Sequence, residues 1–102
     1  MLLKWEQIYH APKIGAMRGA RKSIHAPEHT LLRYWLVSKR NEGGYTQREL
    51  ASKLEVVHSY VAKVESGERR LDVIEFFEYC TALDAEPTDF YTKLGEATNK
   101  VK

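Results

Sequence analysis

The strongest structural signal in this 102-residue chain is the stretch TQRELASKLEVVHSYVAKVESG, residues 46–67. Thr46 and Glu49 form a Thr-x-x-Glu capping box, which predicts that a helix begins there. Apolar residues then recur at helical spacing in two sets, which are Leu50, Ala51 and Leu54 and then Val57, Val61 and Val64. Gly67 suits the left-handed residue that often follows a helix. The stretch therefore predicts two short helices joined by a tight turn.

The same stretch resembles the helix-turn-helix of the lambdoid repressor family, which includes the Cro, cI and XRE proteins. The residues that carry the resemblance are Thr46-Gln47, Leu50-Ala51, Val61, Val64 and the ending Glu65-x-Gly67, and the similarity extends from Leu32 to about Leu94. Two packed helices from an unrelated bundle would share the Leu/Val spacing, but not these polar residues together with Arg69-Arg70. The resemblance implies an all-α fold, a compact five-helix lambda-repressor-like DNA-binding domain with its helix-turn-helix at about residues 46–66.

The chain pattern predicts where the five helices lie. The first should span about residues 27–41, because Pro27 suits the first helical position and Gly43-Gly44 ends the segment. Its inward side chains should be Leu32, Trp35 and Leu36. The second and third helices should cover residues 46–54 and 58–66.

The fourth helix should begin at Asp72, which forms a second capping box with Glu75. We expect its buried stripe to consist of Val73, Phe76, Phe77, Cys80 and Leu83. A short fifth helix should run from Pro87 or Thr88 to Leu94. Residues 26–94 would then form the helix-turn-helix domain, and residues 95–102 a polar, frayed tail.

Residues 1–25 read as a loosely ordered basic N-terminal arm, because they contain Pro12, Gly15 and Gly19 and no sustained periodicity. Some lambdoid repressors wrap such an arm around the duplex. The arm residues that could contact DNA in this way are Arg18, Arg21 and Lys22. An ordinary solvated tail, or an upstream extension with the true start at Met17, is the alternative.

Composition and charge bound the class of protein. A chain of 102 residues has room for one modest core, and its one cysteine, Cys80, excludes an internal disulfide and suits a core position. Residues 1–70 carry 13 Lys/Arg and 7 Asp/Glu, a balance of +6, whereas residues 71–102 carry 3 and 7, a balance of −4. This division favours one surface for phosphates and another kept away from them, unless the clustering is chance. Without a membrane-spanning run or a secretion signal, we expect a cytoplasmic, nucleoid-associated protein.

In this motif the third helix lies in the major groove, and residues near its start point to base edges. By register with the family, the expected base-reading residues are His58, Ser59 and Lys63. Lys63 can donate a hydrogen bond to guanine, and Ser59 can either donate or accept one. His58 can also donate or accept, so its preferred base is not predictable. The expected backbone contacts are Thr46, Gln47, Tyr60, Arg69 and Arg70. Gln47 stands at a helix N-terminus, which attracts a phosphate through exposed N–H groups and the helix dipole.

The resemblance also implies a structural ion pair between Arg40 and Glu65, whose spacing from Gln47 matches the family's repressors. Two residues depart from the family pattern. Glu55 stands where the turn usually has glycine, which would cost on the order of 1–2 kcal/mol in a left-handed conformation. Val57 replaces the usual Ser/Thr cap of the third helix, which would cost about 1 kcal/mol. Either the turn differs or stability comes from elsewhere.

The leading functional hypothesis is a sequence-specific DNA-binding transcriptional regulator, a repressor of prokaryotic or phage type. Specific binding normally needs two half-sites, so we expect a homodimer, with Phe90, Tyr91 and Leu94 as candidate interface residues. The alternative is an antitoxin or another protein-interaction module with the same fold, in which a toxin partner docks on the acidic part or on the N-terminal segment. No catalytic constellation, cofactor motif or metal-ligand spacing is present, so an enzyme is not expected.

Overall fold

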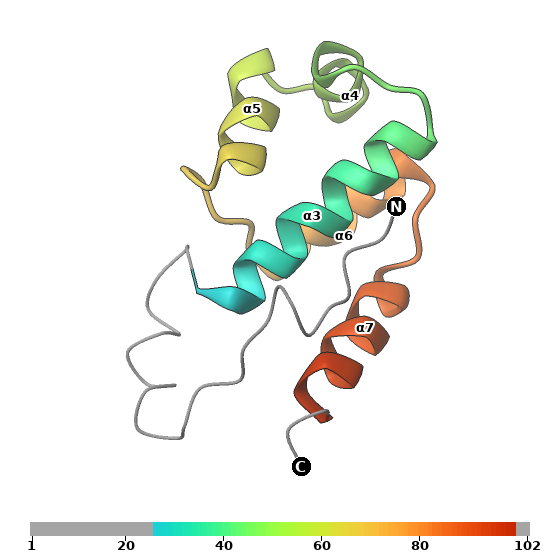
Figure 1. The fold of residues 1–102 in the computed structure, drawn as a ribbon. Helices are drawn as coiled ribbons and strands as arrows, with labels where there is room; N and C mark the ends of the chain where they lie inside the picture. The colour runs from blue at the N-terminus through green and yellow to red at the C-terminus, as the bar shows by residue number, and fades with distance from the viewer. Residues whose placement is uncertain (1–25, 100–102) are drawn as a thin grey trace.

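The computed structural model describes residues 26–99, and within that range the chain forms five α-helices and no strand (Figure 1). Their bounds are α3 Pro27–Glu42, α4 Gln47–Leu54, α5 His58–Ser66, α6 Val73–Leu83 and α7 Pro87–Asn99. The predicted all-α, five-helix domain is confirmed. The arm at residues 1–25, with Arg18, Arg21 and Lys22, lies outside the described residues.

Two capping boxes begin the helices that the sequence placed after Thr46 and Asp72. The Thr46 hydroxyl accepts from the Glu49 N–H at 3.1 Å, and the Thr46 N–H donates to the Glu49 carboxylate at 2.8 Å. At α6 the same exchange joins Asp72 and Glu75 over 2.7 and 2.9 Å. Each box satisfies two backbone N–H groups at the start of a helix, where these groups have no intrahelical partner. Local sequence therefore sets both starting points.

The turn between α4 and α5 keeps the left-handed residue of the motif without a glycine. Glu55 has φ 60° and ψ 42°. Its N–H donates to the Ser52 carbonyl at 3.1 Å, and the N–H of Val56 donates to the Ala51 carbonyl at 3.0 Å. These bonds satisfy the last carbonyls of α4 and offset part of the strain at Glu55. Val57 stands at the N-cap of α5, and because its side chain is apolar it makes no cap hydrogen bond.

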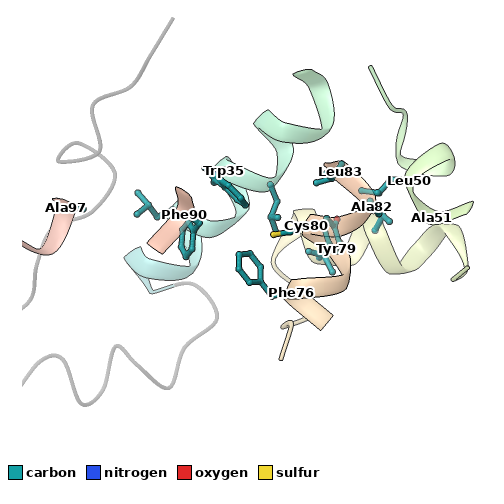
Figure 2. Close-up of a cluster of buried hydrophobic side chains, with 14 residues drawn as sticks. Trp35, Leu50, Ala51, Phe76, Tyr79, Cys80, Ala82, Leu83, Phe90 and Ala97 are labelled. Carbon is teal, nitrogen blue, oxygen red and sulfur yellow. The ribbon is translucent and has the colours of Figure 1, made fainter. Parts of the chain in front are cut away.

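The core collects apolar side chains from all five helices. Figure 2 labels those that come from α3, α4, α6 and α7. Three of its aromatic rings pack together: the Trp35 ring lies 5.6 Å from Phe90 and 6.1 Å from Phe76, measured between ring centroids. Such tilted pairs add to the stabilisation from burial. Cys80 is fully buried, and burial raises the pKa of its thiol to about 12. It is a core residue, as the sequence predicted.

The predicted buried stripe of α6 is partly wrong. Phe76, Cys80 and Leu83 are buried, but Val73 and Phe77 are 67% and 59% exposed. The other buried residues of this helix are Tyr79 and Ala82. Because α6 packs against both α4 and α7, its buried face includes Tyr79 and Ala82 in place of Val73 and Phe77. In α3, Leu31 is likewise fully buried, and Leu32 only partly.

Helix α7 is longer than the sequence predicted. It continues through Gly95 to Asn99, five residues past the expected end at Leu94, so a frayed tail from residue 95 is wrong for this part of the chain. Phe90 and Ala97 lie two turns apart on one face and both are buried. Their burial holds the additional turn against the domain, where α7 packs against α3 and α6. Phe90 is therefore a core residue and is wrong as an interface residue.

Candidate nucleic-acid interface

Helices α4 and α5 lie next to each other at one end of the molecule, and α7 lies at the opposite end (Figure 1). Val61 and Val64 fix α5 to the core, since both are buried. Helical geometry then leaves Ser59 and Lys63 exposed on the side away from the core, whereas Tyr60 packs partly against it. The exposed side of α5 is therefore the side that a second molecule can contact.

The three residues predicted to read bases all lie on α5. Ser59 and Lys63 are exposed, and His58 is half-buried. Within the described part of the chain, the side chains of these three residues make no hydrogen bond and no ion pair. Their donors and acceptors therefore need not break an internal contact before they meet another molecule.

Behind this face, Arg40 and Glu65 form a nearly buried ion pair that joins α3 to the end of α5. Arg40 Nε donates to Glu65 Oε2 at 2.6 Å and Arg40 Nη2 to Oε1 at 3.0 Å, and the side chains are 14% and 9% exposed. Arg40 Nη1 also donates to the carbonyl of Tyr45 at 2.8 Å. The hydrogen bond with Glu65 raises the pKa of Arg40. The pair expected from the resemblance is present.

Gln47 belongs to the same network, which the sequence did not indicate. Its Nε2 donates to Oε1 of Glu65 at 2.8 Å, so one carboxylate holds both Arg40 and Gln47. Gln47 is half-buried at the N-terminus of α4, beside the exposed cap residue Thr46. The residue expected to bind a phosphate is thus oriented by the same carboxylate that braces the motif.

A second contact group surrounds Tyr60 on α5. The guanidinium carbon of Arg69 lies 4.4 Å from the centre of the Tyr60 ring. Arg69 also forms a two-pronged ion pair with Glu75, with distances of 3.2 and 3.0 Å. Burial is the main cause of a raised pKa for Tyr60. The sequence suggested Tyr60 and Arg69 as backbone contacts, but it assigned Glu75 only a capping role.

The remaining cationic residues differ in their surroundings. Arg70 is exposed on the segment that follows α5. Lys53 lies 4.5 Å from the centre of the Tyr45 ring and donates to its hydroxyl at 2.8 Å, so it stabilises the start of the motif. No group of His, Cys, Asp and Glu residues within residues 26–99 could hold a metal ion. Over the same range, no helix is long and apolar enough to cross a membrane.

Two packed helices, a braced turn and a free outer surface on the second helix define the class of helix-turn-helix DNA-binding proteins. The helix-turn-helix family model matches residues 36–90, just over half of the chain. A solved structure, described as an XRE-family like protein from Pseudomonas syringae pv. tomato str. DC3000, matches with a TM-score of 0.70 and 40% identity. The match covers 78% of this chain and 96% of that one. No curated protein matches.

The chain belongs to the XRE family of helix-turn-helix proteins. It is a DNA-binding regulator in the general sense that this family defines. The family predicted from the sequence is therefore confirmed.

Proposed function

We propose that the protein is a sequence-specific transcriptional repressor of prokaryotic or phage type that reads the major groove with α5. The observation that carries this proposal is the outer surface of α5, where His58, Ser59 and Lys63 have no internal partner in the described structure. Lys63 can donate to guanine O6 or N7, and Ser59 can donate or accept. Val61 and Val64 hold the helix from behind.

Backbone contacts would flank this surface on both sides. Thr46 and Gln47 stand at the N-terminus of α4, where N–H groups and the helix dipole favour a phosphate. Tyr60, Arg69 and Arg70 flank the other side of α5. The excess of positive charge in residues 1–70 supports the same surface, and the arm residues Arg18, Arg21 and Lys22 would add to it.

A homodimer is part of the proposal, because one α5 reaches too few base pairs for high specificity. Tyr91 on α7 is the best-placed residue for the interface, since it is 49% exposed, whereas Leu94 is partly buried. Sedimentation at tens of micromolar should detect a dimer, and Tyr91→Ser should shift it toward the monomer. A purely monomeric parent protein would contradict this part of the proposal.

A repressor is favoured over an activator on simple steric grounds. A bound domain excludes other proteins from the same DNA without any further surface, whereas activation needs an additional contact. The proposed location is the cytoplasm, on the nucleoid, where the DNA sites would be.

Selection of bound fragments from a random duplex library tests the central claim. We expect an enriched palindrome whose half-sites are one helical turn apart, about 10 base pairs. With five or six phosphates neutralised, log affinity should fall with log salt at a slope of about −5. Recovery of no enriched sequence by the full-length protein would overturn sequence-specific binding.

A second candidate function is an antitoxin, and one observation favours it. Val73, Ile74 and Phe77 are large, apolar and exposed on α6, in the acidic part of the chain. Exposed apolar groups of this kind commonly mark protein contacts. An antitoxin should co-purify from its native host with an untagged toxin, and Phe77→Asp should release that protein. Purification of the chain alone would contradict this alternative.

A further inference from the structure

Glu75 lies at the start of α6, outside the helix-turn-helix, yet it contacts the side chains that flank α5. Its Oε1 accepts from the Asp72 N–H at 2.9 Å and from Arg69 Nη1 at 3.2 Å. Its Oε2 accepts from Arg69 Nη2 at 3.0 Å. The carboxylate thus holds Arg69 by two parallel bonds while the cap at Asp72 holds the carboxylate. A two-pronged pair of this kind fixes direction as well as distance.

The direction in which Arg69 is held matters for the DNA backbone. Its guanidinium carbon lies over the Tyr60 ring, and Nη1 and Nη2 both donate to Glu75. Nη1 also donates to the Arg70 carbonyl at 2.7 Å. The Nε–H and the second N–H of Nη2 make no hydrogen bond within residues 26–99. These two donors form the other edge of the fork, and that edge has the geometry that binds a phosphate.

We propose that Glu75 is a positioning residue for DNA binding, which aims the free edge of Arg69, and with it Tyr60, at one phosphate of the backbone. The inference rests on the proposed function. Glu75 itself does not contact the phosphate, because two negative groups repel each other. Its effect comes from ordering an arginine that would otherwise lose several rotamers on binding. The raised pKa of Arg69 and the lowered pKa of Glu75 agree with this charged pair.

The variant Glu75→Gln separates positioning from helix capping. Glutamine keeps an oxygen for the Asp72 N–H, and it is an accepted residue in a capping box, but it loses the charged two-pronged bond. Glu78→Gln is the matched control, because Glu78 is exposed on the same helix and makes no ion pair in the described structure. Both variants remove one negative charge, so their difference reports the contact with Arg69.

The experiment measures the Kd for the duplex recovered by the library selection. We expect E75Q to bind about 3- to 10-fold more weakly than E78Q, which is the range for ordering one long side chain. In the R69A background, E75Q should have no further effect, and R69A itself should reduce the salt slope by about one. R69K should weaken binding as E75Q does, since lysine keeps the charge without the fork.

A spectroscopic readout separates positioning from a general loss of structure. The side-chain protons of Arg69 should show an upfield NMR shift from the Tyr60 ring, and this shift should shrink in E75Q but not in E78Q. Equal affinity for E75Q and E78Q, or tighter binding by E75Q, would overturn the inference while leaving the proposed function intact. Failure of the parent protein to select any duplex would overturn both.

Discussion

Gln47 and Glu65 are joined by a 2.8 Å hydrogen bond from the side-chain amide of Gln47 to the carboxylate of Glu65. The same carboxylate accepts two bonds from Arg40, so it links three helices through one nearly buried group. A charge in such a position is stable only while its partners remain in place. In this protein the stability of the motif and the orientation of a proposed DNA contact therefore depend on one side chain.

Arg40→Ala should destabilise the fold far more than the same substitution at a neighbouring cationic residue. Removing one partner of a buried pair leaves the other charge unpaired, which costs about 3–5 kcal/mol, and we expect about 3 kcal/mol here because Glu65 keeps slight exposure. Lys39→Ala is the control, since its pair with Glu42 is longer and more exposed and is worth under about 1 kcal/mol. Urea unfolding measures both values. Equal stability of R40A and the parent would refute the structural role.

Lys63 and Gln47 should affect DNA binding in different ways. Lys63→Met should relax preference at one base position by about 1–3 kcal/mol, because its ammonium group is proposed to meet a base edge. Gln47→Ala should weaken binding to all sequences more evenly, as expected for a backbone contact. Competition binding with duplexes that differ at single positions distinguishes the two patterns. A uniform loss for Lys63→Met would remove it from the base-reading set.

Replacing the left-handed residue between α4 and α5 should stabilise the protein. Glu55 has φ 60°, where a side chain costs on the order of 1–2 kcal/mol and glycine costs nothing. Part of this gain is lost because glycine has more freedom in the unfolded chain, so we expect Glu55→Gly to add about 1 kcal/mol. Thermal unfolding measures the change. Glu68→Gly, at a position without a positive φ, should give no such gain.

His29 should make stability depend on pH below neutrality. Burial lowers the pKa of this histidine, and the positive charges of Arg70 and Arg33 lower it further. The unfolded chain then binds the proton more readily than the folded one, so stability is lost as the pH falls from 6.5 through the folded pKa. His29→Gln should lose less stability than the parent between pH 7.5 and 5 in urea titrations. Parallel losses would show that His29 does not contribute.

Most of what the sequence predicted correctly depends on neighbours along the chain. The two capping boxes, the break after α4 and the pair of helices in the motif all arise within a few residues of each other. The Arg40–Glu65 pair was found through the family's spacing, because the two residues are far apart in the sequence. The contacts of Glu65 with Gln47 and of Arg69 with Glu75 were missed, since the residues involved already had plausible local roles.

The choice of buried faces could be made only in three dimensions. Helix α6 has apolar residues on every side, so periodicity alone could not decide between Phe77, which is exposed, and Tyr79, which is fully buried. Phe90 was predicted as an interface residue because the other apolar side chains filled the expected core, but its ring packs against Trp35 and Phe76. A helix buries the side that its neighbours cover, and those neighbours are set by packing across the whole chain.

Local chemistry in the sequence thus determined that the chain forms helices, where α4, α5 and α6 begin, and which family it belongs to, because caps and turns act over a few residues. Tertiary structure decided which apolar groups form the core, how far α7 extends, and which polar groups hold the α5 surface in place. Those outcomes depend on contacts between distant segments, and their energies appear only when the helices pack together.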